Sequence, residues 1–538
     1  MLSSRRRACL IGGTHKILPS LRVATATAIF GYVFSVVTFG VISPATALPS
    51  FARQTGQPCG TCHTDFPGLT PYGRKFKLLG YTVGGGRYRT TLFPEFKPDP
   101  LASFANDAKS VLGKTSSAGY ESQQNDEGQG KTWVPPISMM AIGGYTNTQT
   151  SQTPPCGPYK CNDNFVASPV SFFYGGAITE NIGAFIQATY NGAPFGVPLS
   201  TDPYATFQWS WDNTDVRYAN SARFGSLDVI YGITANNNPS VQDPWNTTPA
   251  WKFPYASSNV GPKPATATLI DGGLGPGHVA GVGGYAFIND LLYVELTGYR
   301  SIGFNAQTKL GIDPYGAGMI SGVAPYWRLA IEPHWGNHWF MIGTYGMSAR
   351  LQQWDSSQVD ANGLQIPAFL PFTDRFTDTA FDAQYQYQGP NYWFTLRGTY
   401  IHEDQKLDAT FNNPAGAGSS NPSNRLDTFR GEASLAYGND NRVVLTAQYF
   451  NTKGSSDAIL YGGNVSQFDP NQTPPTDPNS NGYIFEIAYI PFISSQSPVW
   501  PWANMRVGLQ YTYYNRFDGD TVFAKNNNTL FAYLWFAM

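Results

Sequence analysis

A strict alternation of apolar and polar side chains runs through most of this 538-residue chain and limits what it can fold into. In residues 381–388 the odd positions hold Phe, Ala, Tyr and Tyr, and the even positions hold one Asp and three Gln. Residues 392–401 and 429–437 repeat the pattern. Because successive side chains of a β-strand point to opposite faces, a period of two predicts strands with one apolar and one polar face.

The lengths of the connections indicate how the strands are arranged. Short connections at 179–182, 288–291, 335–338 and 388–391 alternate with long ones at 149–168, 236–278, 301–323, 349–376, 403–425 and 452–480. Short and long connections therefore lie on opposite rims. Bacterial outer-membrane barrels have an even number of antiparallel strands, short periplasmic turns and long extracellular loops.

We predict an all-β fold, an antiparallel transmembrane β-barrel of about sixteen strands with both chain ends in the periplasm. The strands are expected near residues 137–148, 169–178, 183–191, 204–218, 224–235, 279–287, 292–300, 324–334, 339–348, 377–388, 391–402, 426–437, 442–451, 481–490, 502–514 and 528–538. The last of these resembles an outer-membrane assembly signal, although it ends in Met538 instead of an aromatic residue. The polar strand face, with Arg397, Arg430 and Glu432, would line the lumen.

Composition excludes two classes of protein. Charged residues make up only 13% of the chain and aromatic residues 15%, which suits many short strands better than a helical bundle. After position 50 no span of about 20 apolar residues occurs, so a polytopic helical protein is excluded. The net charge of −2 leaves no basic stripe for a nucleic-acid partner.

Residues 1–47 have the pattern of a secretory signal peptide. Arg5, Arg6 and Arg7 precede an apolar stretch at 23–42, and Ala-Thr-Ala at 45–47 forms a cleavage site. A retained N-terminal membrane helix is the alternative. The exported chain divides into a segment at 48–136, rich in Gly and Pro, and a barrel at 137–538. The segment either fills the barrel lumen or folds freely in the periplasm.

Four cysteines remain in the exported chain. Cys156 and Cys161 lie in a loop rich in Pro and Asn, and we expect them to form a disulfide in an oxidising compartment.

Cys59-Gly-Thr-Cys-His63 fits the C-x-x-C-H signature of covalent haem c attachment. Two thiols on one helical turn reach the two vinyl groups of the porphyrin, and the adjacent imidazole ligates the iron. A thioredoxin-type dithiol would need a surrounding βαβ pattern that the sequence lacks. A closed zinc site would need four ligands, and residues 48–138 contain only these three Cys or His side chains. The sequence therefore predicts one covalent haem c, bound by Cys59, Cys62 and His63, with His63 as the metal ligand.

The sixth iron ligand must come from the barrel, because residues 48–138 contain no Met and no second His. The candidates are Met139, Met140, His334 and His338, and each could equally be an ordinary lipid-facing or interfacial residue. Only one of the two Met side chains can face the lumen, because strand side chains alternate. An open sixth position would instead allow peroxide chemistry.

Residues 48–63, continuing through 66–81, resemble the haem segment of the fused cytochrome–porin family of iron-oxidising bacteria. The barrel resembles the same family at residues 231–255. The resemblance implies a monohaem segment in or against a barrel of about sixteen strands. It also implies that electrons pass from extracellular Fe(II) to a periplasmic cytochrome c or cupredoxin. Only Cys59, Cys62 and His63 are carried over from the family's motif.

Three functions are compatible with these features. The first is an outer-membrane electron carrier that acts formally as an Fe(II) oxidase. The second is a solute porin whose haem-bearing segment gates or senses. The third, a haem peroxidase, would need a catalytic Arg such as Arg74, Arg87 or Arg89, and these charges are better explained as solvated or paired with lumen carboxylates.

Overall fold

The computed structural model describes residues 48–82, 120–121, 133–152, 160–190, 209–316, 318–361, 366–414, 416–462 and 475–538. The predicted signal peptide at 1–47, Arg87, Arg89 and Cys156 lie outside these residues. Cys161 is disulfide-bonded. In the described parts of the chain, no helix is long and apolar enough to cross a membrane.

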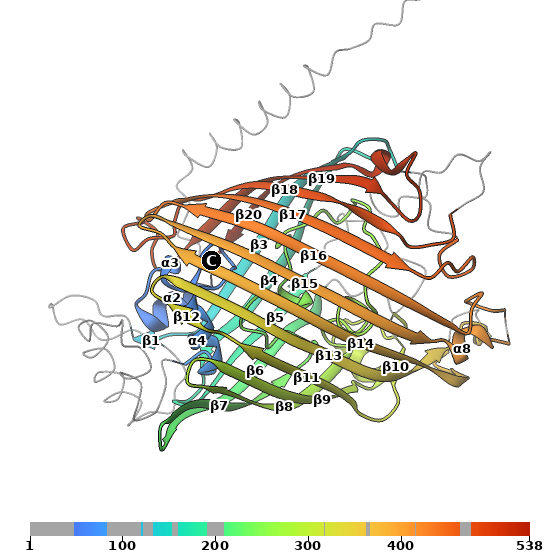
Figure 1. Cartoon of the computed structure of the whole chain (residues 1–538), viewed down its shortest axis with the longest axis horizontal. Helices are drawn as coiled ribbons and strands as arrows, with labels where there is room; N and C mark the ends of the chain where they lie inside the picture. The colour runs from blue at the N-terminus through green and yellow to red at the C-terminus, as the bar shows by residue number, and fades with distance from the viewer. Residues whose placement is uncertain are drawn as a thin grey trace, which may run out of the picture. The chain divides into compact units, whose positions relative to one another are not determined.

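Short helices and long strands make up the described chain (Figure 1). The helices are α2 (Pro49–Thr55), α3 (Cys59–Cys62), α4 (Pro71–Leu78), η1 (Pro249–Trp251), α7 (Phe304–Lys309), α8 (Asp408–Phe411) and η2 (Ala524–Asn527). The strands are β1 (Tyr120–Glu121), β2 (Trp133–Val134), β3 (Ile137–Thr148), β4 (Asn164–Ala177), β5 (Ile182–Tyr190), β6 (Trp209–Phe224), β7 (Leu227–Asn236), β8 (Val279–Ile288), β9 (Leu292–Ser301), β10 (Met319–Ile320), β11 (Ala324–Ile331), β12 (His334–Trp335), β13 (His338–Trp354), β14 (Phe369–Gln388), β15 (Tyr392–Lys406), β16 (Ser423–Tyr437), β17 (Arg442–Gly454), β18 (Ser480–Ile490), β19 (Asn504–Arg516) and β20 (Thr529–Ala537).

The strands form a closed antiparallel barrel. Its sheet contains eighteen of the described strands, of which β10 and β12 are two-residue pieces paired with β13 on either side of β11. Sixteen long strands therefore form the wall, as predicted. Each pairs with its neighbour in sequence, and β20 pairs with β3 to close the ring.

The alternation in the sequence separates an outer from an inner face. On β14, Phe381 is 59% exposed, whereas the neighbouring Asp382 is buried. The same alternation exposes Leu396 and Phe429 on β15 and β16. It buries Arg397 and Glu432, which form an ion pair of 2.7 Å inside the barrel. An apolar outer face around a polar interior is the arrangement of a transmembrane barrel, in which only every second residue meets lipid.

Turn lengths also follow the prediction. One rim carries the short turns at 178–181, 225–226, 289–291, 336–337, 389–391 and 438–441, and the C-terminal residue lies at the same rim. The strands reach further toward the other rim than predicted: β14 begins at Phe369 instead of residue 377. Phe369 and residues 373–376 pair with β13 across a register shift, although the outer side chains of this stretch are less apolar, so a hydrophobicity pattern alone placed the strand boundary too late.

Candidate functional site

Residues 48–82, which we call the N-terminal segment, lie against the inner face of the barrel wall. The segment forms hydrogen bonds with buried side chains on six different strands. These are Ser138 on β3, Asp215 on β6, Tyr285 on β8, Gln386 on β14, Arg442 on β17 and Arg506 on β19. A segment that reaches inner faces all round the ring lies in the lumen. Lys75 pairs with Asp290 in a short turn at 2.9 Å, so the segment lies at the short-turn rim.

The Cys-x-x-Cys motif forms one helical turn. α3 spans Cys59–Cys62, and the backbone N–H of His63 donates to the carbonyl of Cys59 at 2.9 Å. Both cysteines are free thiols, and both side chains are partly exposed. The backbone N–H of Gly60 donates to the carbonyl of Ile493, also at 2.9 Å, and ties the turn to the β18–β19 connection. The two thiols and the imidazole that follows therefore project from one anchored turn.

The imidazole of His63 is held by its Nδ1 atom, which lies 3.2 Å from the carbonyl oxygen of Pro67. A carbonyl can only accept, so Nδ1 carries the hydrogen and Nε2 keeps its lone pair. Histidine ligands of metals are usually oriented in this way. Burial lowers the pKa of His63 to about 4, so the ring is neutral at physiological pH. A neutral imidazole with a free Nε2 suits an iron ligand.

The environment of the two thiols is unlike that of a redox dithiol. Burial raises the pKa of Cys59 to about 11, and burial together with the neighbouring Cys59 raises the pKa of Cys62 to about 12. Reactive cysteines have lowered pKa values, because the thiolate is the nucleophile. Among the described residues, no group of three or more His, Cys, Asp or Glu is arranged to hold a metal ion. Two free thiols on one turn and an imidazole held through Nδ1 would suit a group attached through sulfur and bound by one imidazole.

Helix α4 packs against α3 and holds it in place. Thr70 caps α4 by accepting from the backbone N–H of Gly73 at 3.2 Å, and its hydroxyl donates to the carbonyl of Thr61 at 2.6 Å. A Cβ atom at Gly73 would lie 2.3 Å from the carbonyl oxygen of Cys62. Glycine is required here because the two helices approach backbone to backbone.

The four candidates for a sixth ligand are in different surroundings. Met140 shares the inner face of β3 with Ser138 and packs against the buried cluster that contains Phe76 and Tyr81 of the N-terminal segment. Met139 takes the opposite, outer face. His338 lies against Tyr387 on the outer face, with ring centres 4.7 Å apart, and His334 is exposed in the two-residue strand β12. Among these four residues, only Met140 packs against the N-terminal segment.

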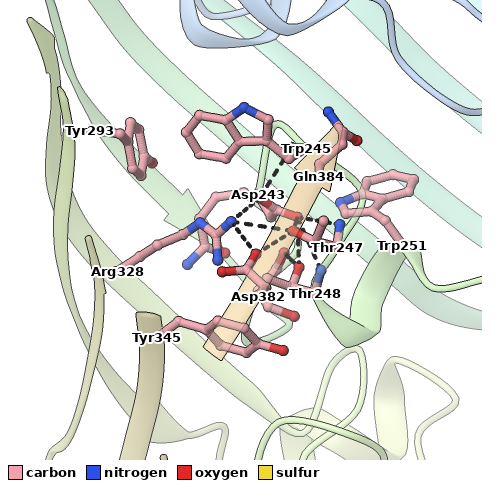
Figure 2. Close-up of polar contacts among 12 residues, drawn as sticks. Asp243, Trp245, Thr247, Thr248, Trp251, Tyr293, Arg328, Tyr345, Asp382 and Gln384 are labelled. Carbon is pink, nitrogen blue, oxygen red and sulfur yellow. Dashed lines mark hydrogen bonds and ion pairs between the residues drawn. The ribbon is translucent and has the colours of Figure 1, made fainter. Parts of the chain in front are cut away.

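A second structure crosses the lumen. Residues 237–278, which connect β7 to β8 and which we call the lumen loop, hydrogen-bond to inner side chains of β14, β15, β17 and β19. Near the start of the lumen loop, the guanidinium of Arg328 lies between Asp243 of the loop, at 3.1 Å, and Asp382 of β14, at 2.7 Å (Figure 2). The rings of Trp245 and Tyr345 lie 5.1 and 5.3 Å from this guanidinium. All three charged side chains are fully buried.

The N-terminal segment and the lumen loop are joined directly. The Nζ atom of Lys77 donates to the carbonyls of Val241 and Asp243 at 2.7 and 2.8 Å and lies 4.4 Å from the ring centre of Trp251. Burial lowers the pKa of Lys77 to about 7. Arg74, on the same helix, pairs with Glu332 at 2.5 Å, as expected of an arginine that meets a lumen carboxylate. Helix α4 thus links the turn at Cys59–Cys62, which we call the attachment turn, to the lumen loop.

Sequence reasoning did not find the lumen loop's binding partners. It placed charged side chains on the inner strand faces but could not indicate that Asp243, 85 positions before Arg328, shares a buried ion-pair cluster with it.

The fold defines a class of protein: a sixteen-stranded outer-membrane β-barrel with its lumen crossed by the N-terminal segment and the lumen loop. No protein-family model matches the sequence, and no curated protein matches it. Similar solved structures include OprB of Pseudomonas putida and OmpF of Salmonella typhi in complex with daunomycin. OprB has 14% identity and a TM-score of 0.40 over 74% of this chain and 93% of its own, and OmpF has 12% and 0.40 over 75% and 97%. The outer-membrane channel DcaP of Acinetobacter baumannii has 10% identity and a TM-score of 0.38 over 78% of this chain and 100% of its own.

Proposed function

We propose that this chain is an outer-membrane electron carrier in which Cys59, Cys62 and His63 bind one haem c. The observation that carries the proposal is the attachment turn itself: two free thiols on one helical turn, followed by an imidazole whose Nδ1 is held by the carbonyl of Pro67. A bound haem would supply a one-electron couple. The protein's part is to fix the turn inside the barrel, where α4 and the wall hold it.

The location of the turn supports delivery of electrons to the periplasm. The turn lies at the rim with the short turns, which we assign to the periplasm because short turns of outer-membrane barrels are periplasmic. From there a soluble cytochrome c or cupredoxin could collect the electron. The resemblance to the fused cytochrome–porin family motivates Fe(II) as the donor, and membership in that family stays a prediction.

The test begins with protein purified from outer membranes. We expect covalent haem to remain on the chain in a denaturing gel, and we expect it to be absent from a Cys59→Ser/Cys62→Ser variant. Fe(II) should convert the oxidised spectrum of the wild type to the reduced one. A wild-type chain without covalent haem would rule out the electron carrier. A haem-bearing chain that Fe(II) leaves oxidised would rule out only this donor.

A solute channel is the second candidate, and the width of a sixteen-stranded barrel favours it. The structure of the lumen decides what conductance to expect. Because the lumen loop and the N-terminal segment both cross the lumen and bind each other, we expect a low conductance in planar bilayers. A large, steady ohmic current from the full chain would instead support the channel.

A further inference from the structure

Arg442, the first residue of β17, reaches into the attachment site. Its Nη1 atom donates to two successive backbone carbonyls, those of His63 and Thr64, each at 2.5 Å. Its Nε atom donates to the carbonyl of Gly438 at 3.1 Å. A Cβ atom at Gly60 would lie 3.1 Å from its Nη2 atom, so the guanidinium also touches the middle of the Cys-x-x-Cys turn.

The charge of this guanidinium is balanced differently from that of six other lumen arginines. Each of these six forms a direct ion pair with a carboxylate. The six are Arg74, Arg217, Arg328, Arg397, Arg430 and Arg506. The hydrogen bonds of Arg442 within the described residues all go to backbone carbonyls. The acid that acts on it electrostatically is Asp65, which also faces Arg506 at 3.8 Å.

A guanidinium stays protonated in proteins, so Arg442 brings a fixed positive charge to a buried site. Electrostatic interactions are stronger in such surroundings than in water. One-electron reduction lowers the positive charge of a haem iron by one, and a nearby fixed cation therefore favours the reduced form. We propose that Arg442 is a positioning residue that holds the attachment turn and raises the reduction potential of the haem bound there. This inference rests on the proposed function.

The experiment is a potentiometric titration of the haem-bearing full chain, with three variants. Arg442→Gln keeps hydrogen-bond donors but removes the charge, and Arg442→Lys keeps the charge. Arg223→Gln removes an arginine charge from the exposed end of β6 and serves as the control. We expect Arg442→Gln to lower the equilibrium constant for reduction about tenfold, which corresponds to about 59 mV for one electron. Arg442→Lys and the control should stay close to the wild type.

Each outcome separates the two proposals. A wild type without covalent haem contradicts the proposed function. A haem-bearing Arg442→Gln protein with the wild-type reduction potential contradicts the role of Arg442. An Arg442→Lys protein whose reduction potential is lowered as much as that of Arg442→Gln also contradicts it, because the charge would then not be the cause. If Arg442→Gln does not assemble, Arg442→Met gives the same comparison, since it also removes the charge and keeps an unbranched stem.

Discussion

The buried ion-pair cluster around Arg328 allows a prediction of size as well as direction. Arg328→Met would leave the carboxylates of Asp243 and Asp382 buried without their cation. With an effective dielectric constant of about 20, the attraction across 3.1 Å is about 5 kcal/mol and that across 2.7 Å about 6 kcal/mol. Desolvation of the three groups offsets much of this attraction. Removal of one partner from a buried pair typically costs about 3–5 kcal/mol, and we expect a loss in that range.

The assay is denaturant unfolding of the barrel in lipid micelles, followed by the fluorescence of tryptophans such as Trp245, which lies against the guanidinium. Arg223→Met is the matched control, because the Arg223 side chain is 46% exposed in its pair with Asp228. An exposed pair of this kind contributes between zero and about 1 kcal/mol.

A rescue variant sharpens the same test. Adding Asp243→Asn and Asp382→Asn to Arg328→Met removes the stranded charges, so much of the lost stability should return. The lumen loop should also become accessible to proteases in the single variant and protected again in the triple variant. If Arg328→Met unfolds within about 1 kcal/mol of the wild type, the cluster does not hold the loop and the reasoning is wrong.

Three further predictions concern the N-terminal segment. Because burial lowers the pKa of Lys77 to about 7, the unfolded chain binds a proton between about pH 7 and 10 that the folded chain does not, so stability should rise with pH across that window. Lys77→Met should flatten this rise, measured as the urea midpoint of unfolding at each pH. An unchanged dependence of the midpoint on pH would contradict the lowered pKa of Lys77. Gly73→Ala should separate α4 from α3 and reduce the haem content, measured by the pyridine haemochrome assay. Gly303→Ala is the control, because a Cβ there meets nothing within 4 Å, and its haem content should stay unchanged. Equal haem content in the two variants would count against the close approach of α4 and α3. Met140→Leu should lower the reduction potential if Met140 ligates the iron, with the outward-facing Met139→Leu as control, and equal potentials in both variants would remove Met140 as ligand.

Most of the wall could be predicted from the sequence because its physical rule is local. Alternation depends only on neighbouring residues, and it placed Phe381 outward and Asp382 inward correctly. It also located β5 and β9 to within one residue at each end. The C-x-x-C-H motif is equally local, because α3 is four residues long, and the haem that it predicts stays a prediction.

The contents of the lumen could not be predicted in the same way. Arg442 lies 379 positions from His63 in the sequence, and no local pattern indicates that the two meet. Asp243 and Arg328 pose the same problem over a shorter separation. Such contacts depend on where the closed ring brings distant strands, and this is a property of the assembled barrel.

Closure of the ring by β20 and β3 also limits the order of assembly. The seam pairs the last strand of the chain with the first strand of the wall, so the ring cannot close before the last residues of the chain are available. The N-terminal segment, which precedes β3 in the chain, therefore gains its complete set of partners only once β17 and β19 have joined the wall.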